Sequence, residues 1–249
     1  ATEGISLSGD IITSTSNPTA APLNEIDVTG ELRISGNRVL KTGGNTEDNG
    51  GANTSISTGA IRSTADSGDD LTVDAGAGTV EVGQIGLSAA DDDVNAVRLY
   101  ADSGITLNGA VYTGIDGDPN AGAVDINGPV ILGTDITIDS TDSGGTNPGS
   151  VDFESTVDSS GTPGYDLTVN AGGQTVSFNG IVGTDAGSDL MNGITVTGGT
   201  INLGASVYTG EDSGTNAGRV DLNGAVVLGA DVTIDTTDSG ATNPGSVDF

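Results

Sequence analysis

The chain has 249 residues, of which 34% are hydrophobic and 3% aromatic, and its formal net charge is −29. Six lysine and arginine residues stand against 35 acidic ones, which excludes the cationic surface that nucleic acids and anionic membranes need in a partner. Histidine and cysteine are absent, so the usual general bases, thiol nucleophiles and disulfides are excluded as well.

The chain is a tandem array, and we expect residues 1–249 to form a single solenoid domain. Residues 1–69 are a diverged copy of the repeat, residues 70–165 a clear copy and residues 166–249 an incomplete one. Residues 70–153 align with residues 166–249 at an offset of 96 without a gap. The matching blocks include VYTG at 111 and 207, and TDSGGTNPGSVDF at 141 against TDSGATNPGSVDF at 237. A fixed period of this kind is typical of repeat architectures.

A shorter period runs along the whole chain, marked by strand-like segments such as GISLSG, TVEVG and VDING. Alternating apolar and polar residues rich in Val, Ile and Thr indicate half-buried strands, and no stretch has helical periodicity. Successive segments begin 19 to 27 residues apart, which predicts about ten rungs of roughly 24 residues each. The first apolar positions of the eleven segments are Ile5, Leu32, Ile56, Val80, Ile105, Val124, Val151, Val176, Ile201, Val220 and Val247.

A second strand pattern, as in DLTVD at 70 and DLTVN at 166, follows most of these segments. A two-strand unit of this size cannot bury its apolar face alone, so identical units must stack and share one core. The sequence therefore predicts an all-β protein, a parallel β-solenoid. An antiparallel sandwich is the alternative, but it is usually richer in core aromatic residues.

The strings VDLNG, DVTID, GSVDF and DLTVN resemble the strand repeats of very large bacterial surface and secreted proteins, the filamentous-haemagglutinin-like adhesins. The resemblance implies a right-handed parallel β-helix that serves as a stalk, fibre or adhesin outside a bacterial or archaeal cell. It covers nearly the whole chain and carries no catalytic signature. The high negative charge agrees with a salty, cation-rich exterior.

Asn-Gly pairs occur at 108, 127, 179 and 223, at similar places in the rungs. Asn and Gly both tolerate a positive φ, so we expect the chain to turn there, with the Asn side chains stacked into a ladder. The expected role is structural.

Aspartates recur at outward strand positions, with Asp125 expected beside Asp152 and Asp221 beside Asp248. Like charges at the strand spacing repel by about 0.9 kcal/mol in water, and cations would relieve this repulsion. The candidate metal site is the loop that contains Asp116, Asp118 and Asn120, whose oxygen ligands suit Ca²⁺. A solvated acidic loop is the alternative, and it also applies to residues 91–93.

Two other functions are alternatives to a structural one. A polysaccharide lyase or hydrolase would need basic residues near its carboxylates, but the five arginines are scattered and Arg219 is replaced by Ala123 in the preceding copy, so we expect no enzyme. Ice binding would need a flat face of paired threonines, whereas each second strand offers one Thr.

Both ends of the sequence have the strand pattern. SVDF at 246–249 corresponds to SVDF at 150–153, which continues into the next segment, and GISLSG begins at residue 4. We therefore expect edges that accept another strand, from a longer repeat chain or from a subunit stacked head to tail. The expected function is an extracellular fibre or stalk. The alternative is an adhesin domain that binds a glycan or a surface protein along its side.

Overall fold

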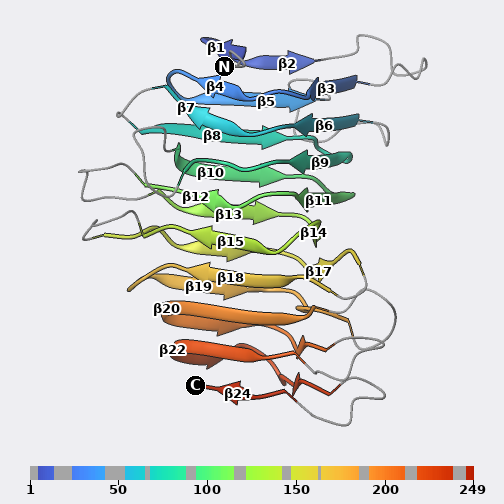
Figure 1. Ribbon diagram of the computed structural model, residues 1–249, viewed down its shortest axis with the longest axis vertical. Coiled ribbons are helices and arrows are strands. Elements are labelled where there is room, and N and C mark those ends of the chain that lie inside the picture. Colours follow the sequence, from blue (N-terminus) through green and yellow to red (C-terminus); the bar gives the residue numbers. More distant parts are fainter. Residues whose placement is uncertain are drawn as a thin grey trace.

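The computed structural model describes residues 5–13, 24–42, 54–64, 68–87, 94–114, 122–141, 147–161, 164–184, 191–210, 218–237 and 245–249. These residues form short strands and no helix, and every strand pairs in parallel with its neighbours. The strands coil into a stack of turns along the long axis, with the two ends of the chain at opposite ends of the stack (Figure 1). The predicted parallel β-solenoid is confirmed, and the antiparallel sandwich is excluded.

Each turn has three faces rather than the two strands expected. The first face contains β1 (Ile5–Leu7), β4 (Leu32–Ile34), β7 (Ile61–Ser63), β12 (Val111–Tyr112), β15 (Ile136–Asp139), β18 (Asp166–Asn170), the first halves of β20 (Gly193–Leu203) and β22 (Val220–Leu228), and β24 (Val247–Asp248). Ile85 bridges Ile61 and Val111 on this face.

The second face contains β2 (Ile11–Thr13), β5 (Arg38–Thr42), β8 (Asp69–Asp74), β10 (Val94–Tyr100), β13 (Val124–Asn127), β16 (Val151–Phe153), β19 (Thr175–Phe178) and the second halves of β20 and β22. The third face contains β3 (Asn24–Val28), β6 (Thr54–Thr58), β9 (Thr79–Val82), β11 (Gly104–Leu107), β14 (Val130–Leu132), β17 (Val157–Ser159), β21 (Val207–Tyr208) and β23 (Ile234–Asp235). Val182 links β17 to β21 through isolated bridges.

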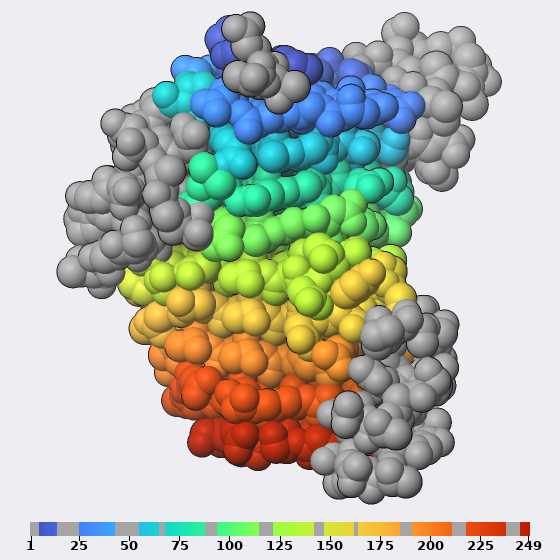
Figure 2. Space-filling view, viewed as in Figure 1, coloured from blue at the N-terminus to red at the C-terminus, as the bar shows by residue number. Residues whose placement is uncertain are grey.

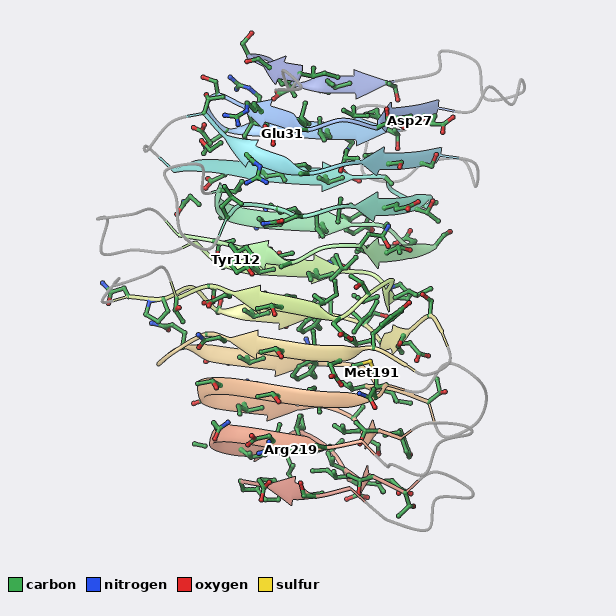
Figure 3. The ribbon with its side chains drawn as sticks, viewed as in Figure 1. Asp27, Glu31, Tyr112, Met191 and Arg219 are labelled. Carbon is green, nitrogen blue, oxygen red and sulfur yellow. The ribbon has the colours of Figure 1, made fainter. Side chains whose placement is uncertain are left out.

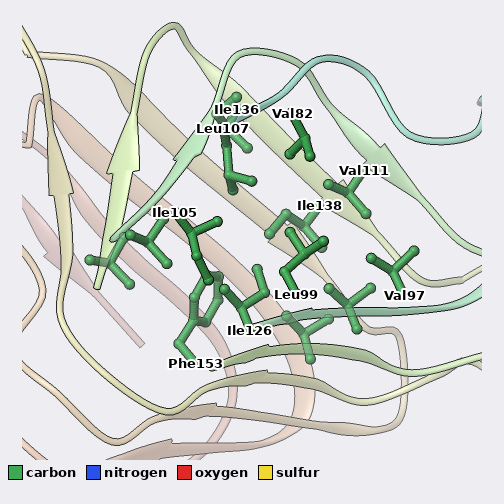
Figure 4. Packing of buried hydrophobic residues seen from close by; sticks show 14 of the residues in the cluster. Val82, Val97, Leu99, Ile105, Leu107, Val111, Ile126, Ile136, Ile138 and Phe153 are labelled. Carbon is green, nitrogen blue, oxygen red and sulfur yellow. The ribbon is translucent and has the colours of Figure 1, made fainter. Parts of the chain in front are cut away.

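The core lies inside the coil and is built from the inward residues of all three faces (Figure 4). In β8, for example, Leu71 and Val73 are buried, while the alternate residues Thr72 and Asp74 are only partly buried. Because side chains alternate across a strand, the period-two pattern of the sequence becomes a dry interior and a polar exterior. Adjacent turns pack as continuous layers along the axis (Figure 2).

The sequence segments predicted to stack are mostly true neighbours. Seven of the ten successive pairs are in register, for example Ile5 with Leu32, Val80 with Ile105 and Val176 with Ile201. The other three, Leu32 to Ile56, Ile105 to Val124 and Ile201 to Val220, pass to a different face and span less than a whole turn. The turns are therefore longer than predicted, and their number is slightly lower than ten.

The 96-residue repeat is not a whole number of turns. From Val124 on the second face, three stacking steps lead through Val151 and Val176 to Ile201 on the same face. The chain then passes along the third face to reach Val220, the counterpart of Val124, on the first face. One repeat of 96 residues thus covers three complete turns and two faces of a fourth turn. A residue in the later copy therefore lies one face before the face that its counterpart occupies, as Val220 on the first face does relative to Val124 on the second.

Candidate functional site

Outward side chains form columns that run along the stack, because neighbouring strands are in register. On the second face the column from Arg98 passes through Asp125, Asp152 and Ser177 to Asn202. The predicted stacking of Asp125 with Asp152 and of Asp221 with Asp248 is confirmed. Arg98 Nε donates to Asp125 Oδ2 at 3.0 Å, so the first carboxylate of this column is paired with a cation.

Asp152 is the residue of this column whose carboxyl group has a raised pKa. Burial raises its pKa above the ordinary value of 3.8, and the nearby charges of Glu154 and Asp125 raise the pKa further. The amide of Asn179 compensates in part, since Nδ2 donates to Asp152 Oδ1 at 3.3 Å and to Glu154 Oε2 at 3.1 Å. The column carries uncompensated negative charge that dissolved cations can screen.

The asparagines do not form the ladder expected of them. Asn127 pairs in register with Tyr100, and Asn223 with Thr197, so neither stacks on the asparagine of another pair. Asn108 Nδ2 donates to Glu81 Oε1 of the preceding turn at 2.7 Å, and Asn179 Nδ2 donates to Asp152 and Glu154. The amides of Asn108 and Asn179 therefore bind carboxylates of the preceding turn.

The glycines of the Asn-Gly pairs are needed for a reason other than the one expected. Of the four, only Gly128 has a φ in the left-handed region, at 147°. A Cβ at Gly109, Gly180 or Gly224 would lie 2.5 Å or less from the backbone of a neighbouring turn. These glycines let adjacent turns approach closely.

A polar groove of about 310 Å³ lies on the first face, across three successive turns. Asp166, Gly193 and Arg219 are consecutive along one column, and Gly193 leaves the space between the other two side chains open. Asn192 Nδ2 donates to Asp166 Oδ1 at 2.7 Å, and Thr168 and Thr195 line the floor. The groove brings together a carboxylate, an amide, two hydroxyls and a guanidinium.

Burial and hydrogen bonding act in opposite directions on the pKa of Asp166, which is raised overall. Burial raises the pKa of this carboxyl and the bond from Asn192 lowers it, while the charge of Asp135 raises it again. Arg219 Nη2 lies 2.5 Å from Asp221 Oδ2 and 3.4 Å from Asp248 Oδ2, and these ion pairs hold the guanidinium at the edge of the groove that it lines. In the preceding copy Asn95 Nδ2 similarly donates to Asp70 Oδ1, at 2.8 Å, but Ala123 stands in place of Arg219.

Sequence reasoning missed this groove because its residues are far apart in the chain. Their relation becomes visible only once Asp166 is known to pair with Gly193. Arg219 also carries no signal of its own in the sequence, since the equivalent residue of the preceding copy is Ala123.

The loop predicted to hold Ca²⁺, with Asp116, Asp118 and Asn120, lies outside the described residues, as do residues 91–93. In the described ranges, no group of three or more acidic residues is placed to hold a metal ion. The column of threonines is short, because Thr137, Thr168 and Thr195 stack but Asp221 takes the next position. Of the three strands that carry these residues, only β20 has a second outward threonine, Thr197. The regular double row that ice binding requires is absent from this column.

Residues at the C-terminal edge of the stack are exposed where their repeat counterparts are buried. Leu228 is 58% exposed and Leu132 is 0%, while Phe249 is 76% exposed and Phe153 is 0%. Phe153 is covered by Phe178 on the next turn, and Leu132 pairs in register with Ser159 of β17. In the interior copy, the following turn therefore buries the apolar side chains of Leu132 and Phe153.

Cations gather toward the opposite end. Four of the six lysine and arginine residues lie between residues 33 and 62. Glu31 accepts from Arg33 Nε at 2.6 Å and from Arg62 Nε at 3.0 Å, and Lys41 Nζ lies 2.7 Å from Asp74 Oδ2. Glu31 is near the N-terminal end of the stack and Arg219 near the C-terminal end (Figure 3).

Comparison with known proteins found no matching family model, no similar curated protein and no similar solved structure. Within the described ranges, no helix is long and apolar enough to cross a membrane.

Proposed function

We propose that the chain is a segment of an elongated extracellular fibre or stalk, extended along the solenoid axis by further turns of the same kind. The observation that carries the proposal is that each turn buries apolar side chains of the turn before it: Phe178 covers Phe153, and Leu132 pairs in register with Ser159 of the next turn. Because the 96-residue copies carry the same apolar positions, further turns of this kind can extend the stack.

The polarity of the coil decides how such a segment extends. All strands pair in parallel, so the C-terminal edge of one segment continues in the same sense only by meeting the N-terminal edge of the next. The next segment is either a covalent continuation of the chain or a second subunit.

The place of action in this proposal is the exterior of a bacterial or archaeal cell. The net charge of −29 supports it, as does the resemblance of the repeats to those of filamentous-haemagglutinin-like adhesins. A structural role also agrees with a surface on which the described residues form columns of polar side chains along the stack.

The test compares two versions of the protein: the chain itself, and the chain extended after Phe249 by a second copy of residues 154–249. The extension supplies the turns that follow Phe153 in the interior copy, so we expect the longer protein to fold as a single rod, and limited proteolysis to spare the junction. The midpoint of urea unfolding should also rise. A cleavable junction with an unchanged midpoint would contradict the proposal.

Subunit stacking is tested by sedimentation velocity and electron microscopy over a range of concentrations. The unextended chain should form end-to-end rods, and Leu228→Asp should shift the concentration for rod formation upward by at least tenfold. Ile131→Asp is the matched control, because Ile131 is 40% exposed on the side of the stack and is the counterpart of Val227. Equal behaviour of the two variants would exclude stacking through this edge and leave covalent continuation.

A second function, recognition of a glycan or a surface protein, is favoured by the groove between Asp166 and Arg219. Its hydroxyls, amide and charged groups match the donors and acceptors of a sugar. A glycan array should then give binding that Arg219→Ala reduces at least tenfold. Arg98→Ala is the control, since Arg98 is similarly exposed and paired with an aspartate on another face.

A further inference from the structure

The 96-residue repeat and the turns of the coil are out of step. Asp125 and Asp152 stack on the second face, and their counterparts Asp221 and Asp248 stack on the first. The same change of face occurs between Val130 and Val226, which lie on the third and second faces.

Equivalent residues of the two copies keep the same local hydrogen bonds although they lie on different faces. Thr141 donates from its backbone N and from Oγ1 to Asp139 Oδ1, at 2.9 and 2.6 Å, where the chain leaves the first face. Their counterparts Thr237 and Asp235 make the same two bonds, at 2.8 and 2.6 Å, where the chain leaves the third face.

The stem of the following loop is repeated as well. Ser140 Oγ donates to the carbonyl of Gly149 at 2.6 Å, and its counterpart Thr236 Oγ1 donates to the carbonyl of Gly245 at 3.1 Å. Two of the three corners of the coil therefore accept the same turn, so this change of face preserves the local contacts of the segment.

We propose that every further 96-residue unit in the fibre is rotated by one face, about a third of a turn, relative to the unit before it. This inference rests on the proposed function, since it concerns units that extend the stack. Each unit advances three turns and two faces, so three units of 96 residues span eleven turns before a surface feature returns to its starting face. With turns about 4.8 Å apart, one unit rises roughly 18 Å and the true axial repeat is roughly 53 Å.

The rotation decides how the fibre presents itself to a partner. A column of side chains carried by one unit, such as Asp125 with Asp152, reappears on each side of the rod in turn. A partner that recognises this feature can then approach the fibre from any side, with three sites in each axial repeat.

The rotation is tested first within the chain, by cross-linking pairs of introduced cysteines, since the protein has none of its own. Asp221 pairs in register with Thr195 on the first face. If a unit were instead four whole turns, Asp221 would lie over Asn202, which stacks three turns above Asp125. We expect the variant with Thr195→Cys and Asp221→Cys to oxidise readily and the variant with Asn202→Cys and Asp221→Cys to remain reduced.

Asp125→Cys with Asp152→Cys is the positive control for geometry between adjacent turns. Cross-linking at Asn202 and Asp221, or failure of both test pairs when the control oxidises, would overturn the rotation. These outcomes are independent of assembly, so a chain that never forms rods refutes stacking without affecting the cross-links.

The rotation between units is then measured in the chain extended by residues 154–249, or in rods, by cryo-electron microscopy. A symmetry of about 18 Å rise with a rotation near 120° is expected. A rise near 19 Å without this rotation would overturn the inference.

Discussion

The rings of Phe153 and Phe178 stack in the core, with centroids 4.9 Å apart and planes inclined by 7°. They are register neighbours in β16 and β19, and both are fully enclosed. The counterpart of Phe153 is Phe249, which has no described turn beyond it and is 76% exposed. A turn that follows in the stack therefore removes the side chain of an apolar residue such as Phe153 from solvent.

The first prediction concerns this aromatic pair. Phe178→Ala removes a large buried side chain and the ring contact, and should lower the free energy of unfolding by about 3–5 kcal/mol. Urea unfolding followed by circular dichroism measures the change. Phe249→Ala is the control, expected to change stability by less than about 0.5 kcal/mol because the ring is exposed. Similar losses in both variants would contradict the described packing.

The second prediction concerns close approach between turns. Gly128 has a φ of 147°, and a Cβ there would lie 2.1 Å from the carbonyl oxygen of Ala101. Gly128→Ala should therefore destabilise the protein by about 1–3 kcal/mol, measured as a lower urea midpoint. Gly173→Ala, where a Cβ meets nothing within 4 Å, should be nearly neutral. A neutral Gly128→Ala variant would show that the turns are less tightly spaced.

The third prediction concerns pH. The pKa of Asp152 is raised above its ordinary 3.8, so the folded state binds this proton more tightly than the unfolded state does. The contribution of Asp152 to stability is therefore full below pH 3.8 and is lost as the pH rises through the raised pKa. Asp152→Asn should be more stable than the parent at pH 7, by about 1 kcal/mol or less after screening, and equally stable below pH 3.8.

Asp235 is the contrasting control, because hydrogen bonds from the Thr237 side chain and backbone lower its pKa. Its contribution is present above the ordinary pKa of 3.8 and is lost as the pH falls through the lowered value. Asp235→Asn should therefore reduce stability at pH 7. Thermal unfolding between pH 3 and 7 measures both variants, and a shift of the same sign in both would refute the assignment.

The fourth prediction concerns cations. Stacked carboxylates such as Asp125 with Asp152 repel one another, so salt should raise the melting temperature. If the loop of Asp116, Asp118 and Asn120 binds Ca²⁺, millimolar Ca²⁺ should raise it more than NaCl of equal ionic strength, and this excess should vanish in Asp118→Asn. Equal shifts with both salts would mean screening alone.

The sequence alone determined the strands, their parallel stacking and the aspartate pairs. These follow from the period-two alternation and the regular recurrence of similar segments, which are local properties of the chain. Asp125 and Asp152 could be paired in advance because both follow the first apolar residue of their segment, and those apolar residues stack.

Only the tertiary structure decided which face each segment occupies. Leu32 and Ile56 begin similar segments yet lie on different faces, because the number of residues between stacked neighbours varies with the connections between strands. The same long-range register placed Asp166, Asn192 and Arg219 around one groove, and pressed Gly109 against the backbone of Gln84. A local pattern can specify a strand and its buried side, but the contacts between turns depend on the path of the whole coil.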